Sequence, residues 1–190
     1  MNPIGTPTIK TVGHSNHPIG RFVDLLKAGG VEMLVDVRST PYSRRFPQFG
    51  REKLTGALAG SGIDYLYAGA ALGGKSGASY DASAAQPAFG DALDDLVTRS
   101  ADRTLCLMCA EKEPLDCHRT VLVSRHLAER GVAIEHLLAD GRTEPHAAIE
   151  DKLLGKGGPD LFPTDRATRL AEAYAARERK MKGPSPRNRL

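Results

Sequence analysis

Five short apolar segments alternate with amphipathic segments along most of the chain, and this alternation restricts the fold more than any other feature. The apolar segments are 9–12, 31–37, 63–67, 104–109 and 132–138. They have the length of β-strands, and the almost continuous apolar run at 31–37 is typical of a strand covered by helices on both faces. Strands separated by helices in this way form parallel sheets. We therefore predict an α/β fold, a three-layer sandwich around a mainly parallel sheet of about five strands.

The segments between these strands carry helix signals. After His17-Pro18, residues Ile19, Phe22 and Leu26 fall on one helical face, and Gly29-Gly30 then ends the helix. Similar patterns predict helices over 53–60, 87–100, 117–130, 145–154 and 164–182. The stretch 68–85 is rich in Gly, Ala and Ser, which predicts a long surface loop.

The composition is typical of a soluble globular protein, with 41% apolar and 26% charged residues in a chain of 190. A chain of this length buries a sufficient core without disulfides or metals. The odd number of cysteines, Cys106, Cys109 and Cys117, favours a reducing compartment over a disulfide framework. No segment resembles a signal peptide or a membrane span. We predict a cytoplasmic protein with no membrane partner.

The positive charge is concentrated near the C-terminus. Residues 164–190 contain eight basic and three acidic residues, a net charge of +5, whereas the whole chain carries +3. We predict an α/β domain over 1–154, followed by a linker and a basic C-terminal helix and tail over 155–190. A basic tail binds nucleic acid in some proteins and only maintains solubility in others.

Polar side chains follow several of the predicted strands at the point where each strand ends. Ligands of open parallel sheets bind outside the carboxyl ends of the strands. These side chains are therefore expected to share one edge of the sheet and to form a site there. The candidate site residues are His14, Asp36, Arg38, Ser43, Glu111, Cys117, His118 and Arg119.

The helix that begins at Cys117 suggests what this site binds. A helix N-terminus presents free N–H groups and a partial positive charge, which favour an anion. Arg38, Arg119 and Ser43 are the candidate anion-binding residues, since a guanidinium group is a bidentate donor for phosphate, sulfate or carboxylate. A simpler interpretation pairs Arg119 with Glu111 or Glu113.

The remaining candidates suggest catalytic roles. The thiol of Cys117 is the candidate nucleophile, because a helix start lowers a thiol pKa. His14 or His118 would act as acid or base, with Asp36 or Glu111 orienting it. Structural alternatives remain open: Cys117 as a helix cap, and Asp36 with Arg38 as a buried ion pair.

Some of the same residues are also candidate metal ligands. His14, Glu111, Cys117 and His118 are metal-ligand types, but no pair of them has a recognised zinc spacing. Two adjacent residues of a regular helix, such as Cys117 and His118, would not face one ion. Neither a metal nor another cofactor is predicted.

Two functions are compatible with the sequence. The first is a hydrolase or group-transfer enzyme that acts on a small anionic ligand. The alternative is a nucleic-acid-binding or adaptor module that uses the basic C-terminal helix and the loop 44–53, where basic and aromatic residues are mixed. The sequence does not decide whether the chain is an enzyme.

The motifs at the strand ends resemble a known family. The relevant segments are Thr11-Val12-Gly13-His14-Ser15, Val35-Asp36-Val37-Arg38, Leu72-Gly73-Gly74, and Leu107-Met108-Cys109-Ala110-Glu111 with Cys117-His118-Arg119. Over about residues 8–146 the chain resembles the prokaryotic family catalogued as domain of unknown function 488. This resemblance implies a three-layer α/β fold and a role for the polar motif residues named above, but no particular activity.

A fainter likeness is to rhodanese-like domains and cysteine phosphatases, in which a cysteine ends a central strand before an arginine-bearing helix. Here Cys109 and Arg119 are ten residues apart, which is too far for the compact phosphate loop of those enzymes. This departure argues against Cys109 as a nucleophile of that type. Likeness at the level of fold is in any case a weak guide to function.

Overall fold

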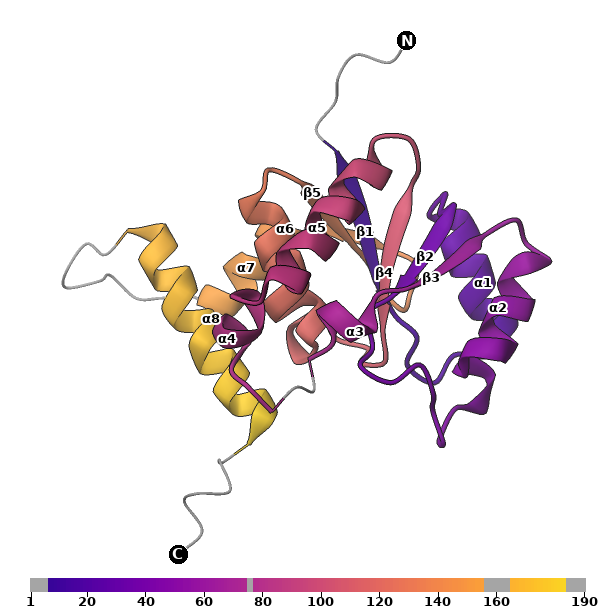
Figure 1. Cartoon of the computed structure of the whole chain (residues 1–190), viewed down its shortest axis with the longest axis horizontal. Helices are drawn as coiled ribbons and strands as arrows, with labels where there is room; N and C mark the ends of the chain where they lie inside the picture. The colour runs from indigo at the N-terminus through magenta and orange to yellow at the C-terminus, as the bar shows by residue number, and fades with distance from the viewer. Residues whose placement is uncertain (1–6, 75–76, 156–164, 184–190) are drawn as a thin grey trace, which may run out of the picture.

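The computed structural model describes residues 7–74, 77–155 and 165–183. They form an α/β fold in which helices lie on both sides of a six-stranded sheet (Figure 1). The strands are β1 (Thr8–Gly13), β2 (Met33–Asp36), β3 (Asp64–Tyr67), β4 (Leu105–Cys109), β5 (Ala133–Leu137) and β6 (Thr143–Pro145). Their order is β3-β2-β4-β1-β5-β6, and only β6 is antiparallel to its neighbour. The predicted three-layer fold is confirmed, with a short sixth strand added.

The predicted helices are also found. They are α1 (Ile19–Ala28), α2 (Arg51–Ala59), α5 (Pro87–Ser100), α6 (Arg125–Glu129), α7 (His146–Leu154) and α8 (Arg166–Lys182). A π-helical segment (Arg119–Ser124) leads directly into α6, and 3₁₀ turns lie at Pro47–Phe49 and Pro114–Asp116. The helix predicted over 117–130 is therefore a π-helix in its first half.

The predicted surface loop over 68–85 is wrong in part. It contains two short helices, α3 (Gly69–Leu72) and α4 (Tyr80–Ala84), and the side chains of Leu72 and Tyr80 are buried in the main core. These two large side chains pack the segment against the core, although its average composition is polar and glycine-rich.

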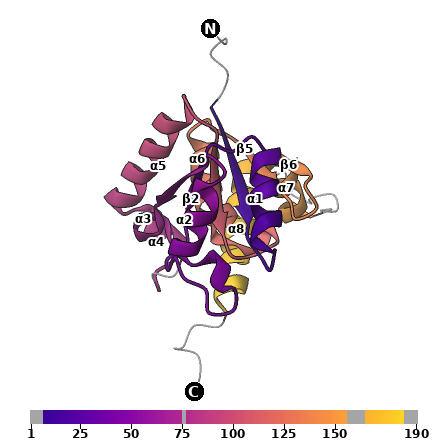
Figure 2. The ribbon, with the colours of Figure 1, turned by 90° about the vertical axis from the view of Figure 1, so that its right-hand side faces the viewer.

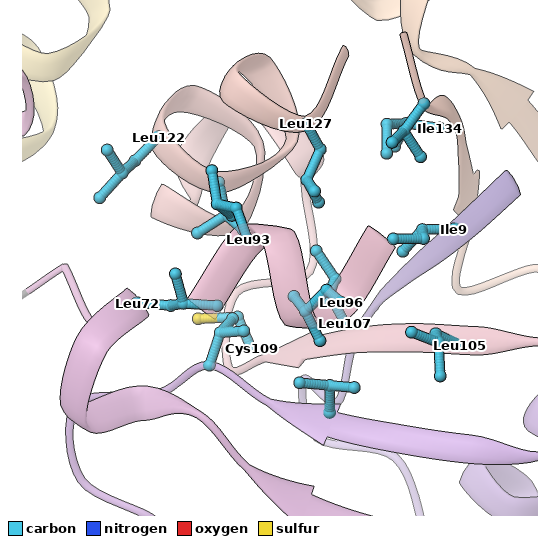
Figure 3. Packing of buried hydrophobic residues seen from close by; sticks show 14 of the residues in the cluster. Ile9, Leu72, Leu93, Leu96, Leu105, Leu107, Cys109, Leu122, Leu127 and Ile134 are labelled. Carbon is cyan, nitrogen blue, oxygen red and sulfur yellow. The ribbon is translucent and has the colours of Figure 1, made fainter. Parts of the chain in front are cut away.

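The central strand β4 separates two hydrophobic cores, because successive side chains of a strand point to opposite faces. Leu105, Leu107 and Cys109 pack into the core beneath α5 and α6 (Figure 3). Cys106 and Met108 pack into the other core, beneath α1 and α2. Covering helices on both faces explain why all five residues of β4 are buried. Figure 2 places α3, α4 and α5 on one side of the molecule, and β6 with α7 on the other.

The strand order brings distant parts of the chain to one edge. Strand β4 pairs with both β1 and β2, so it lies between the first two strands of the chain. Strand order therefore reverses there, and such switch points are where open α/β sheets bind ligands. The segments that follow β1, β2 and β4 meet at this edge.

Helix α8 packs against the α/β fold. Asp165 caps its N-terminus by accepting a hydrogen bond from the backbone N–H of Thr168 at 3.0 Å. Tyr174 is buried in the core beneath α5 and α6. The predicted linker lies almost wholly outside the described residues, as does the end of the predicted tail, so the domain boundary stays a prediction. Within the ranges described, no helix has the length and apolarity needed to span a membrane.

Candidate functional site

The predicted site residues separate into two clusters at the C-terminal edge of the sheet, one on each face. On the face covered by α5 and α6, the structure brings together Cys109, Glu111, Cys117 and His118. On the face covered by α1 and α2, it brings together His14, Asp36 and Arg38. The sheet edge thus carries two polar sites instead of one.

The first group, which we call the thiol cluster, consists of Cys109, Glu111, Cys117 and His118. Their side-chain donor atoms all lie within 4.8 Å of one another. The thiols of Cys109 and Cys117 donate to Oε2 of Glu111 at 2.9 and 3.1 Å. Nδ1 of His118 lies 3.4 Å from Sγ of Cys109 and 4.0 Å from Sγ of Cys117. Both thiols are buried, whereas Glu111 is exposed.

The backbone at Cys117 allows two adjacent residues to face the same point. Cys117 is extended, with φ −132° and ψ 138°, whereas His118 is helical. The carbonyl of Cys117 accepts from the N–H groups of Thr120 and Val121, so Cys117 caps the helix as one of the sequence interpretations proposed. The expectation that Cys117 and His118 must diverge assumed a regular helix through both residues, and this assumption is wrong.

The ring of His118 is fixed from two sides. Its Nε2 atom lies 2.8 Å from the carbonyl oxygen of Val37, at the end of β2. A carbonyl only accepts, so Nε2 carries a hydrogen, and in the neutral ring Nδ1 then presents a lone pair to the thiols. On the other side, a Cβ atom at Gly74 would lie 2.7 Å from Cβ and Cγ of His118. Only glycine fits at that position.

Arg119 holds the backbone that carries Glu111. Its guanidinium group is fully buried and donates to the carbonyl oxygens of Glu111 at 2.6 Å and of Lys112 at 3.2 Å. Gly13 leaves the space for this carbonyl group, because a Cβ atom at that position would lie 1.9 Å from the carbonyl oxygen of Glu111. The guanidinium is thus occupied inside the protein, and its predicted role in holding an anion stays a prediction.

The pKa values of the thiol cluster follow from burial and mutual contact. Burial raises the pKa of Cys109 well above its ordinary value, and the hydrogen bond to Cys117 adds to this. Burial also opposes ionisation of Cys117, but hydrogen bonding by Cys109, the charge of Arg119 and the His118 ring outweigh it and lower its pKa. Although Glu111 is exposed as a residue, its carboxyl group is partly desolvated beside the buried thiols, and this and the Cys117 charge raise its pKa. Burial opposes protonation of His118, but its contact with Cys117 raises its pKa overall.

The second group is a buried ion pair with a histidine beside it. Arg38 donates to both carboxylate oxygens of Asp36, through Nε at 2.8 Å and Nη2 at 2.6 Å. The hydroxyl of Tyr65 donates to the same carboxylate at 2.8 Å. Nε2 of His14 lies 3.3 Å from Nη1 of Arg38, and Nδ1 lies 2.9 Å from the carbonyl of Ser15. The geometry is that of the buried ion pair that the sequence left as an alternative.

Burial sets the ionisation of His14, whereas the contact with Asp36 sets that of Arg38. Burial lowers the pKa of His14 to about 4. The ring of Phe49 stacks on His14 with centroids 4.1 Å apart. Burial opposes the charge of Arg38, but its bonds to Asp36 outweigh this and raise its pKa. His14 is therefore neutral near pH 7 with both ring nitrogens in contact with a partner.

The loop 44–53 and α8, the two basic segments considered for nucleic acid, lie at opposite ends of the molecule in Figure 1. Within the loop, Phe49 is fully buried and Oγ of Ser43 accepts from the backbone N–H of Phe46 at 3.0 Å. Arg51 lies over the ring of Tyr65 at 5.9 Å. Nucleic-acid binding and an anion-binding role for Ser43 both stay predictions.

A cleft of about 1380 Å³ opens on the thiol cluster. Glu111 and His118 line it on the side of the sheet, and the last turn of α8 lines it on the other. Of the acidic residues in its wall, Asp116 pairs with Arg177, Glu178 pairs with Lys182 at 2.8 Å, and Asp81 lies 3.9 Å from Arg125. Arg179 and Lys180 also line the cleft and are exposed.

Two residues of the site escaped the sequence prediction. Cys109 is absent from the predicted site residues, although its side chain contacts both Glu111 and His118. The signal for it was the pair Cys109 and Glu111, two residues apart at the exit of a buried strand. Tyr65 left no comparable signal, because its contact with Asp36 depends on how β2 and β3 pair.

Together, the fold and site define an α/β protein with a polar centre at the switch point of a mainly parallel sheet. A family model described as "Domain of unknown function DUF488" matches residues 18–126. The chain belongs to this family, and the resemblance drawn from the motifs is confirmed. The likeness to rhodanese-like domains is not confirmed. No curated protein and no solved structure is significantly similar to the chain.

Proposed function

We propose that this chain is a hydrolase acting on a small anionic ester, and that the thiol cluster is its reaction centre. One observation carries the proposal: Glu111, the exposed member of the cluster, faces a cleft that α8 lines with Arg179 and Lys180. A carboxylate beside a substrate cleft is suited to general-base catalysis. Exposed cations in the same cleft are suited to holding a negatively charged group.

The reaction follows from this placement. A water molecule in the cleft gives a proton to the Glu111 carboxylate while the water oxygen forms a bond to the central atom of the ester. The bond from that atom to the leaving oxygen then breaks, and the leaving oxygen takes up the proton. Cys117 lies fully buried behind Glu111, which favours water over the Cys117 thiol as the nucleophile. His14, Asp36 and Arg38 would then support the sheet edge without contacting the substrate.

The test is a panel of chromogenic phosphate, sulfate and carboxylate esters offered to the full chain. We expect turnover of at least one of them, and a decrease in kcat of about 100-fold or more in Glu111→Gln, the typical contribution of a general base. Glu52→Gln is the matched control, because Glu52 is exposed on α2, far from the cleft.

The role of the two exposed cations of the cleft is tested with the double variant Arg179→Glu/Lys180→Glu. Reversing both charges should raise KM for an anionic ester by about tenfold or more, because each lost contact of this kind is worth about 1 kcal/mol. The kcat value should change little. Full activity of Glu111→Gln, or no turnover of any ester by the unmodified chain, would reject the proposed function.

A further inference from the structure

We propose that Cys109, Glu111, Cys117 and His118 bind a zinc ion. Two thiols, one imidazole and one carboxylate are the ligand types that zinc takes in proteins. The two sulfur ligands favour zinc over hard ions such as Mg²⁺ and Ca²⁺, which take oxygen ligands. The cluster therefore has the composition of a mixed sulfur, nitrogen and oxygen zinc site.

The spacing of the four donor atoms fits one tetrahedral ion. Zinc bonds of about 2.0 to 2.3 Å at tetrahedral angles place the ligand atoms about 3.3 to 3.8 Å apart. Four of the six separations within the cluster are 2.9, 3.1, 3.4 and 4.0 Å, which is within a few tenths of an ångström of what one ion requires. All six are at most 4.8 Å, so the ligand atoms need to move by no more than about 1 Å to meet one ion.

The surroundings hold these ligands as metal sites require. A ligating histidine usually donates its second ring N–H to a carbonyl or carboxylate, which fixes the ring. Nε2 of His118 has this partner in the carbonyl of Val37 at 2.8 Å, so Nδ1 is left for the ion. The backbone N–H of Arg119 points to Sγ of Cys117 at 3.4 Å and supports a thiolate there.

The difference in burial among the ligands indicates what kind of zinc site this is. Cys109, Cys117 and His118 are buried, whereas Glu111 is exposed and lines the cleft. Catalytic zinc sites have three protein ligands and an exchangeable fourth position, and the bound ion makes water a stronger nucleophile. The site thus fits three fixed ligands with Glu111 as the exchangeable one. This last step rests on the proposed function, but binding of the ion does not.

In the first test, the full chain is reduced and freed of metal with a chelator, and Co²⁺ is then added. Co²⁺ should bind at one equivalent and give the intense visible bands of a tetrahedral site, together with a thiolate-to-cobalt charge-transfer band. One equivalent of Zn²⁺ should then remove these bands. Absence of the charge-transfer band in the reduced chain would overturn the proposal, and so would a Cys109–Cys117 disulfide whose reduction restores no metal uptake.

Variants assign the ligands. Cys109→Ser and Cys117→Ser should each weaken zinc binding by at least about 100-fold, because loss of a supporting contact alone costs 10- to 100-fold. Cys106→Ser is the matched control, since Cys106 is buried in the same strand as Cys109 but faces the other core. An equal loss in Cys106→Ser would contradict the assignment. If a serine variant does not fold, the cobalt spectrum of the unmodified chain decides.

Glu111→Gln separates this proposal from the proposed function. It should keep the thiolate-to-cobalt band, because three ligands remain, and lose hydrolysis. Zinc binding without hydrolysis of any ester would leave the metal site standing and reject the proposed function. Hydrolysis by the fully metal-free chain would keep the proposed function and reject a catalytic role for the ion, and the cobalt spectrum would still decide whether the ion binds.

Discussion

Nε2 of His118 lies 2.8 Å from the carbonyl oxygen of Val37, although the two residues are 81 positions apart in the chain. This contact ties the helix that follows β4 to the end of β2. It also decides which nitrogen of His118 faces Cys109 and Cys117. The orientation of the thiol cluster therefore depends on the pairing of β2 with β4.

Gly74→Ala is expected to disturb the thiol cluster by pushing the ring of His118. The added methyl group would lie 2.7 Å from Cβ and Cγ of that residue. Overpacking of this kind costs about 1 to 3 kcal/mol, which urea unfolding would measure. Gly56→Ala in α2 is the control, because a Cβ atom there meets nothing within 4 Å, and it should stabilise by up to about 1 kcal/mol. Equal stability of the two variants would refute the role given to Gly74.

Arg119→Lys should destabilise the chain even though the charge is kept. A lysine lacks the fork that donates to the carbonyls of Glu111 and Lys112, and each buried carbonyl left unpaired costs about 1 to 3 kcal/mol. Unfolding by denaturant measures this loss. Arg125→Lys, which alters a pair with Glu129 near the surface, should cost less than about 1 kcal/mol. If Arg119→Lys costs no more than Arg125→Lys, Arg119 does not position the loop.

Asp36→Asn should be among the most damaging single changes. It leaves the buried guanidinium of Arg38 without its counter-charge, and removal of one partner of a buried ion pair costs about 3 to 5 kcal/mol. Tyr65→Phe removes only the hydroxyl contact to the same carboxylate, and about 1 kcal/mol is expected. Equilibrium unfolding of both variants tests the order. A smaller loss in Asp36→Asn than in Tyr65→Phe would contradict the buried ion pair.

The stability of the fold should fall as pH is lowered from 7 to 5, partly because of His146. Burial lowers its pKa from 6.5 to about 4, so it stays neutral in the folded chain while the unfolded chain takes up a proton below pH 6.5. His136, Tyr174 and Glu150 face it at 3.0, 3.1 and 3.7 Å. The neutral folded form thus loses stability as pH falls through the range from 6.5 to 4, by about 2 kcal/mol between pH 7 and 5.

The measurement for this prediction is urea unfolding of the chain and of His146→Gln at several pH values. The variant lacks the titrating group, so its stability should depend less steeply on pH over the same range. Curves with the same slope would show that His146 is not the source of the acid sensitivity.

The sequence by itself determined the order of strands and helices and the edge of the sheet where the polar residues gather. Local patterns were sufficient for this, because the strands are short apolar runs and the helix limits carry Gly and Pro signals, as at Gly29-Gly30. The exceptions were the short strand β6, the π-helix at Arg119–Ser124, and the stretch 68–85, where Leu72 and Tyr80 become buried in a core that other helices complete.

Only the tertiary structure decided how the polar residues divide. Side chains alternate across a strand, so a shift of one position along the strand moves a side chain from the face covered by α1 and α2 to the face covered by α5 and α6. Asp36 thus meets Arg38 and Tyr65 on one face, whereas Cys109 meets His118 on the other. That last meeting also needs the extended backbone of Cys117, which no periodicity in the sequence reveals. Long-range strand pairing and the extended backbone of Cys117 just before the helix together create the thiol cluster.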